Sequence, residues 1–148
     1  MLHYILDGNN LIGQHQQLKQ IQKSNKQASR EKLAFMIGNY FADKKVNVSL
    51  HFDGYPKESI RILKAKIIYS ENKSADEIIK NEIEFAKNRT KIILVSSDNN
   101  LKEFAKVCGC KVLSSLEFIS LMNQTKNNSN EKKIDDNDLD FYKKLFNE

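Results

Sequence analysis

Short apolar runs alternate with segments of helical periodicity along this chain, and the alternation limits the possible folds more than any other feature. The apolar runs, each of a length that suits one strand, lie at 2–6, 46–52, 65–70, 91–97 and 110–113. The helical patterns lie at 29–42, from Ser74 onward, at 99–107 and at 114–123. Strands that alternate with helices pair in parallel, with right-handed crossovers and helices on both faces of the sheet. The sequence therefore predicts an α/β fold, a three-layer α/β/α sandwich with a mainly parallel central sheet.

The 148 residues fit one globular domain followed by a short extension. We expect the domain to cover 1–123. The segment 124–133 is polar and low in complexity, which is typical of a flexible linker. Residues 134–148 begin with acids, carry lysines near their end and place apolar residues at helical spacing, which predicts a short amphipathic tail.

The sequence also indicates where the protein acts. No apolar stretch reaches the roughly 18 residues that a membrane span needs, and Asp7 interrupts the N-terminal run that could pass for a signal peptide. Cys108 and Cys110 have no second cysteine pair or histidine cluster to complete a zinc site, so we expect them to pack beside a turn. These features predict a cytoplasmic protein with no membrane partner.

The positive charge is concentrated in the globular part. The whole chain carries +5; residues 131–148 hold six acidic and four basic side chains, a net −2, and the rest holds 13 acidic and 20 basic ones, a net +7. Two basic stretches attract polyanions without reading sequence. Their predicted phosphate contacts are Lys19, Lys23, Lys26 and Arg30 in the first stretch and Lys57, Arg61 and Lys64 in the second. A solvated surface would explain any one of these side chains, but two clusters favour a nucleic acid.

Four aspartates stand where a parallel sheet would bring them together. Asp7, Asp53 and Asp98 each follow an apolar run directly, and Asp76 lies in the first turn of the helix that Ser74 caps. Ligands bind outside the carboxyl ends of the strands in such sheets, so we expect the four side chains at one edge. Any single one could instead be a helix cap or a turn residue, above all Asp53, because a glycine follows it.

Carboxylates that meet at one edge indicate a cation. Like charges repel and raise one another's pKa values unless a cation neutralises them. Oxygen ligands, with no His or Cys among the candidates, suit Mg²⁺ or Mn²⁺ better than zinc. Such an ion could activate a water for attack on phosphorus and neutralise the leaving oxygen. Together with the basic stretches, this pattern predicts hydrolysis of phosphodiester bonds.

Other α/β classes fit the first motif poorly. The turn after the first apolar run has no G-x-G-x-x-G sequence, which argues against a dinucleotide-binding domain. A phosphotransfer receiver domain would need an acidic pair near its first strand, and Asp7 is the only acid before Glu31. A haloacid-dehalogenase-type phosphatase would need a second Asp two residues after the first, where Asn9 stands.

Four motifs, in this order and spacing, resemble the NYN domains of the PIN-like nuclease superfamily, in particular their YacP-like branch. They read ILDGNNLIG, LHFDGY, SADEII and LVSSDNNLKEFA, and the resemblance spans about residues 1–122. It implies a PIN-like fold, metal-dependent endoribonuclease activity on single-stranded RNA or mRNA, and association with RNA and ribosomes. Carried over residue by residue, it implies metal ligands at Asp7, Asp76 and Asp98, with Asn10 and Asp53 as further catalytic residues beside them.

One position departs from the family pattern. Related nucleases often have an acid four residues after the position of Asp98, and Lys102 stands there, with Glu103 next to it. The chain could bind one ion, or recruit Glu77 or Glu103 for a second. A non-catalytic RNA-binding module on the same fold is the alternative function.

Several neighbouring side chains could have more than one role. His15, in a polar loop, and His51, within a strand, are expected to have structural or solvent roles. Tyr55 could stack on a base or pack at the rim of the site. Gly8 is expected to let the backbone turn tightly after the first strand, and the sequence assigns no role to Asn9.

Overall fold

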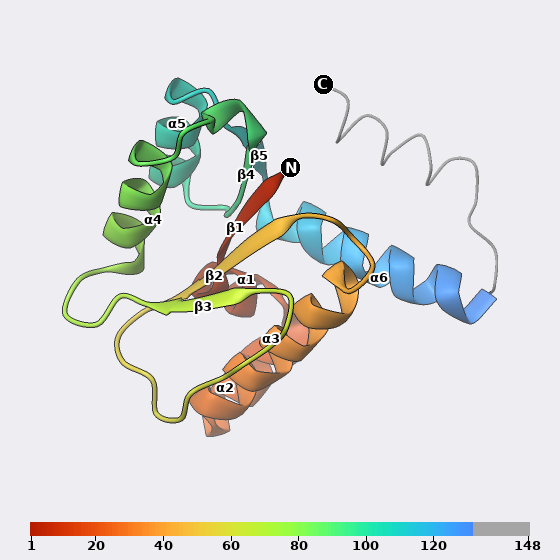
Figure 1. Cartoon of the computed structure of the whole chain (residues 1–148). Helices are drawn as coiled ribbons and strands as arrows, with labels where there is room; N and C mark the ends of the chain where they lie inside the picture. The colour runs from red at the N-terminus through yellow and green to blue at the C-terminus, as the bar shows by residue number, and fades with distance from the viewer. Residues whose placement is uncertain (132–148) are drawn as a thin grey trace.

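The computed structural model describes residues 1–131, with side chains described as far as residue 124, and this part of the chain forms five strands and seven helical segments (Figure 1). The strands are β1 (His3–Asp7), β2 (Asn47–Phe52), β3 (Lys66–Tyr69), β4 (Ile92–Val95) and β5 (Lys111–Leu113). The helices are α1 (Gly8–Gln14), α2 (Gln16–Ser24), α3 (Lys26–Phe41), α4 (Ala75–Glu84), α5 (Asn99–Val107) and α6 (Ser115–Glu131), and a 3-10 turn, η1 (Arg89–Lys91), precedes β4.

The described strands form one parallel sheet in the order β3-β2-β1-β4-β5. All four strand pairs are parallel, and the register places Asp7 opposite His51 and Leu6 opposite Val95. The predicted α/β fold is confirmed, with a sheet that is parallel throughout these residues. Because every strand runs the same way, the carboxyl ends of β1, β2 and β4 lie at the same edge.

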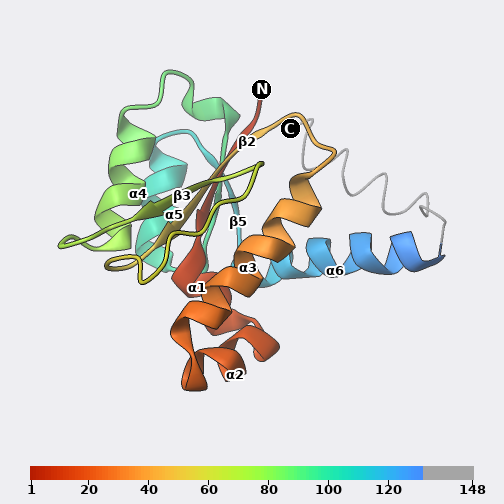
Figure 2. The ribbon, with the colours of Figure 1, turned by 60° about the horizontal axis from the view of Figure 1, so that its bottom comes forward.

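Helices cover both faces of the sheet, which gives the three predicted layers (Figure 2). On one face, side chains of α1, α2, α3 and α6, such as Leu18 and Phe118, pack with Tyr4 and Leu6. On the other face, side chains of α4 and α5, such as Ile79, pack with Ile5 and Leu94. Successive strand residues point to opposite faces, so Asp7, two residues after Ile5, lies on the side of α4 and α5.

The polar stretch after β1 folds into helices that its periodicity did not indicate. His15, predicted in a loop, ends α1 and caps α2, because its Nδ1 accepts a hydrogen bond of 3.1 Å from the backbone N of Leu18. Asn25 caps α3, because its Oδ1 accepts a hydrogen bond from the backbone N of Ala28. The helix therefore begins at Lys26, three residues before its predicted start at residue 29. Ser29 lies inside α3 and donates a hydrogen bond to the carbonyl of Lys26. Only Leu18 of α2 is buried, which explains why the apolar pattern was too sparse to predict that helix.

The last described helix, α6, runs beyond its predicted end. The backbone from 124 to 131 is helical, so the helix includes most of the segment that the sequence analysis assigned to a linker. The predicted tail at 134–148 lies outside the described residues. Within residues 1–131, no helix is long and apolar enough to cross a bilayer.

Candidate active site

Asp7 is a buried carboxylate at the carboxyl end of the central strand. Its side chain caps α1 through a hydrogen bond of 3.4 Å from the backbone N of Asn10, and it accepts a second one of 2.8 Å from Ser96 Oγ. Only 5% of the residue is exposed. Burial raises the pKa of Asp7 above its ordinary value; the two hydrogen bonds oppose that rise, and the negative charges of Asp76 and Asp53 add to it. A cation would therefore relieve an electrostatic cost that the protein alone does not offset.

Asp76 lies in the first turn of α4, beside the same edge of the sheet. Ser74 caps this helix, as predicted, by accepting a hydrogen bond from the backbone N of Glu77. Asp76 is half-buried, and burial, followed by the negative charges of Asp98 and Asp53, raises its pKa while Lys80 opposes the rise. Asp76 thus interacts electrostatically with every other predicted acid of the cluster.

Asp98 follows β4 and is joined to Asp7 through one buried hydroxyl group. Its Oδ1 caps α5 by accepting from the backbone N of Leu101 at 3.0 Å, and its own backbone N donates to Ser96 Oγ at 3.1 Å. Because Ser96 also donates to Asp7, the same Oγ atom links the ends of β1 and β4. The sequence analysis did not identify Ser96; the signal was a serine two positions before an acid at a strand end.

Asn10 holds two other segments in place through its amide oxygen. Its Oδ1 accepts hydrogen bonds from the backbone N of Ser97 at 2.9 Å and from Ser115 Oγ at 2.6 Å. Ser97 Oγ in turn accepts from the backbone N of Ser115. Asn10 therefore fixes the turn that carries Asp98 against the start of α6, which makes it a positioning residue.

Asp53 follows β2 and is fully engaged with its neighbours. Asn9 Nδ2 donates to Asp53 Oδ2, the backbone N of Ala75 donates to Oδ1 at 2.8 Å, and the backbone N of Asp53 donates to Asn9 Oδ1 at 3.3 Å. Asn9, to which the sequence assigned no role, thus forms a two-point contact with Asp53. Because Asp53 binds the first residue of α4, it fixes the position of Asp76, and we expect it to act through that contact.

Gly8 is required by close packing. A Cβ at this position would lie 2.5 Å from the carbonyl oxygen of His51 and 2.7 Å from the ring of Phe52. Its φ angle is not in the left-handed region, which glycines 54 and 109 do occupy. The prediction that Gly8 serves a tight turn is therefore replaced: it lets α1 begin directly against β2.

The structure divides the predicted RNA contacts into two groups. Arg30 is only 4% exposed, donates hydrogen bonds to the carbonyls of Asp53 and Tyr55, and lies over the ring of Phe52, so it is mostly buried and reaches the surface only in the lining of a small pocket beside Asp53. The other six are exposed or half-buried: Lys19, Lys23, Lys26, Lys57, Arg61 and Lys64.

The two basic stretches meet beside Asp53. A small pocket of about 140 Å³ is lined by Lys26 of the first stretch, Lys57 of the second, Asp53 and Tyr55. Tyr55 is 62% exposed. Cations and an exposed aromatic ring thus lie next to the edge where the acids gather, an arrangement that suits phosphates and unstacked bases.

The donor set fits a hard cation held in part by a substrate. Within the described residues, no group of three or more His, Cys, Asp or Glu side chains is arranged so that it could hold a metal ion by itself. Mg²⁺ usually binds through one or two carboxylates together with waters and substrate phosphates, so it does not require such a group. Lys102 is half-buried and Glu103 is exposed on α5. Asp7, Asp76 and Asp98 are therefore the side chains that could hold the ion.

Comparisons with known proteins find a matching family and similar folds. The sequence model of the family described as YacP-like NYN domain matches residues 4–147 of the chain. Two solved structures of Rae1 (YacP) from Bacillus subtilis are similar in fold. The first, a point mutant, is 22% identical with a TM-score of 0.72 over 84% of this chain and 76% of that one. The second is 21% identical with a TM-score of 0.71 over 89% and 79%. No curated protein matches the chain.

Proposed function

Because the chain belongs to the YacP-like NYN domain family, a family of nuclease domains, we propose that it is a metal-dependent endoribonuclease that hydrolyses phosphodiester bonds in single-stranded RNA or mRNA. One observation carries the proposal most directly. Asp7 is a buried carboxylate whose pKa is raised by burial and by two neighbouring acids, which is the environment that a divalent cation stabilises.

In this proposal Asp7, Asp76 and Asp98 hold Mg²⁺ or Mn²⁺. When bound, such an ion polarises a phosphoryl oxygen and lowers the pKa of a water near phosphorus. Ser96 links the carboxylate of Asp7 to the backbone of Asp98, Asp53 sets the start of α4, and Asn10 holds the turn after β4. The surrounding residues thus fix the positions of the three acids, and the acids supply the negative charge that binds the ion.

The exposed lysines on either side of Asp53 support RNA as the polyanion. Lys26 and Lys57 would contact phosphates, and the exposed ring of Tyr55 would stack on a base that is not paired. A cytoplasmic location fits two free thiols, Cys108 and Cys110, in the described part of the chain. Translating ribosomes belong among the substrates to test, because the family resemblance implies association with them.

Cleavage tests the proposal against the non-catalytic RNA-binding module. The purified full chain is incubated with end-labelled single-stranded RNAs and with translating ribosomes, in Mg²⁺, in Mn²⁺ or in a chelator. We expect internal cleavage that requires the metal and is lost in Asp7→Asn and Asp98→Asn but retained in Glu84→Gln, an exposed acid on α4. Intact RNA in both metals, with RNA binding preserved, would establish the binding module instead.

Metal binding can be tested apart from cleavage. Mn²⁺ should raise the Tm of the native chain by linkage, since it binds the folded state only. The rise should disappear in Asp7→Asn and persist in Glu84→Gln. An equal rise in all three proteins would place the metal elsewhere.

A further inference from the structure

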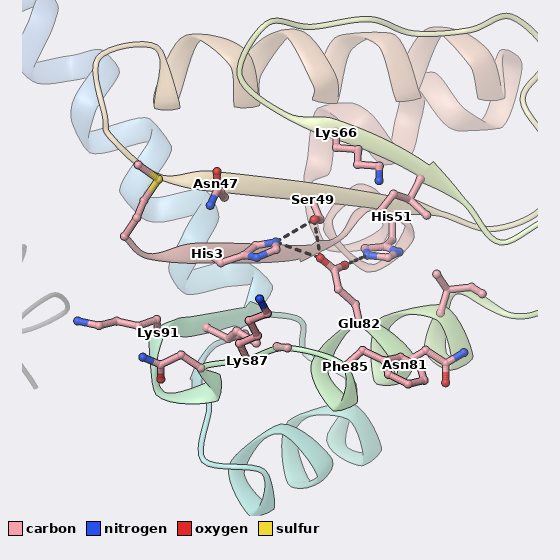
Figure 3. Close-up of a pocket in the computed structure, with 16 residues that line it drawn as sticks. His3, Asn47, Ser49, His51, Lys66, Asn81, Glu82, Phe85, Lys87 and Lys91 are labelled. Atoms are coloured by element: carbon pink, nitrogen blue, oxygen red, sulfur yellow. Dashed lines mark hydrogen bonds and ion pairs between the residues drawn. The ribbon is translucent and has the colours of Figure 1, made fainter.

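A second cavity lies away from the acid cluster, between α4 and the sheet. It has a volume of about 760 Å³ and is bounded by β1, β2, β3, the carboxyl end of α4 and the segment that leads to β4 (Figure 3). Pockets of roughly 300–1,000 Å³ are typical of small-molecule and cofactor sites. None of the predicted metal ligands lines this cavity. It is therefore a separate feature that the proposed nuclease chemistry does not use.

A carboxylate that accepts several hydrogen bonds forms the floor of the cavity. Glu82 of α4 accepts from Ser49 Oγ at 2.6 Å, from His51 Nε2 at 2.6 Å and from His3 Nε2 at 3.0 Å (Figure 3). These contacts hold the pKa of Glu82 well below its usual range although burial acts in the opposite direction. Because three donors share the carboxylate, the floor repels an incoming anion less than a free carboxylate would.

The rim of the cavity is cationic. Lys66 at the start of β3, Lys87 after α4 and Lys91 before β4 all line it and are all exposed. No ion pair joins any of these three lysines to an acid within residues 1–124. Three lysines against one glutamate give the cavity a net positive charge, so it favours an anionic ligand.

An aromatic ring forms part of the wall. Phe85, the residue that ends α4, is 83% exposed and lines the cavity together with Ile68 and Ile78. Asn81 and Asn88 add amide donors and acceptors to the same wall. Apolar area, a ring face, amides and cations are the set of groups that a nucleotide needs.

We propose that this cavity binds a nucleotide, with the base stacked on Phe85 and the phosphate held by Lys87 and Lys91. Inorganic phosphate alone would use the cations but not the ring, and a nucleoside alone would use the ring but not the cations. The nucleotide can come from two sources, a free mononucleotide or a nucleotide within an RNA strand, and both present the same chemistry. In the second case the cavity is a contact for RNA outside the acid cluster.

Binding of defined probes to the full chain tests the proposal. Nucleoside 5′-monophosphates, adenosine and inorganic phosphate are titrated separately in a chelator, with calorimetry for affinity and amide NMR shifts for location. We expect the monophosphates to bind more tightly than adenosine or phosphate, and to shift the amides of residues 81–91. Phe85→Ala should weaken nucleotide binding by about 5- to 100-fold, the effect of losing one stacked base. Joint replacement of Lys87 and Lys91 by alanine should weaken it while leaving adenosine binding unchanged.

Matched controls separate the cavity from general surface effects. Phe35→Ala removes an aromatic ring that is 66% exposed on α3, across the sheet, and Lys106→Ala removes an exposed lysine of α5. Neither should alter nucleotide affinity. The proposal is refuted if no monophosphate binds at millimolar concentration, if phosphate binds as tightly as the nucleotides, or if Phe35→Ala weakens binding as much as Phe85→Ala.

An RNA decamer identifies the source of the nucleotide. If it displaces a monophosphate from the native chain and depends on Phe85, the ligand is a nucleotide of RNA; if it does not compete, the ligand is a free nucleotide. These measurements need neither metal nor cleavage. A chain that binds nucleotides here but cuts no RNA would contradict the proposed function and leave this inference standing.

Discussion

Replacing Glu82 with glutamine removes the charge that joins α4 to the first two strands and changes little else in shape. The carboxylate accepts hydrogen bonds from Ser49, His51 and His3, and 21% of its side chain is exposed. An ionised carboxylate only accepts, so both imidazole Nε2 atoms donate to it. Glutamine can keep the contacts only as neutral hydrogen bonds, after the imidazole tautomers adjust.

The number of bonds sets the size of the effect. A hydrogen bond to a charged group contributes about 1.5–3 kcal/mol to the free energy of unfolding, and a neutral one contributes about 0.5–1.5 kcal/mol. Because three bonds are weakened and the carboxylate is partly exposed, we expect Glu82→Gln to lower the free energy of unfolding by about 2–3 kcal/mol. For a chain of this length, that corresponds to a fall in Tm of roughly 4–12 °C. Glu84→Gln, at an exposed position of the same helix, should change the Tm by no more than a degree or two, as exposed substitutions within about 0.5 kcal/mol do.

The pH dependence of that difference gives a second check. The pKa of Glu82 is lowered by folding, so its ionised form stabilises the native state above its ordinary pKa of 4.5, and the stabilisation is lost as the pH falls below that value. Urea titrations at pH 5 and at pH 3 should show that the difference in free energy of unfolding between the native chain and Glu82→Gln is smaller at pH 3 than at pH 5. Equal stabilities at pH 5, or a gap that stays constant down to pH 3, would refute the charge-assisted network.

The acid edge, the first helix and the basic pocket each allow a further test. Asp7→Asn should raise the Tm at pH 7, because the raised pKa of Asp7 means that its ionisation lowers the stability of the fold as the pH rises above 3.8. At pH 3 the two proteins should unfold alike. Gly8→Ala should destabilise by about 1–3 kcal/mol in urea titrations, whereas Gly13→Ala, with nothing within 4 Å of the new Cβ, should not. Lys26→Ala and Lys57→Ala should each lower the slope of log K against log salt for RNA binding by about 1, and Lys106→Ala should leave it unchanged.

The strands and the acids after them were predictable because their signals are local. The continuous apolar runs before Asp7 and Asp98 became β1 and β4, as is typical of strands buried on both faces. The segment at 46–52, in which apolar and polar residues alternate, became β2 before Asp53. Parallel pairing then brings their ends to one edge without further information. The helix at 99–107 was predicted with its observed bounds, because Asp98 caps it and its apolar stripe is regular.

The contacts that were missed join residues far apart in the sequence. In the sequence, Arg30 cannot be distinguished from a surface cation. In the fold, α3 places it so that it donates to the carbonyl of Asp53 and lies over the ring of Phe52. The sequence does not distinguish Ser96 from the other serines, but the sheet places its hydroxyl group against Asp7. The sequence likewise indicates a solvated helix residue at Glu82, but β1 and β2 place two histidines against its carboxylate. No single-sequence pattern encodes such pairings, because each depends on the assembled sheet.

The bond from Ser115 to Asn10 has a consequence for the order of events during synthesis. It spans 105 positions, so the turn that carries Asp98 is not locked until the start of α6 has been made. Asp7, near the N-terminus, leaves the ribosome early, yet it gains its last neighbours only after most of the chain has followed. A nascent chain shorter than about 115 residues therefore lacks the contacts that hold the turn with Asp98. The acid edge is assembled only after the start of α6 has been made.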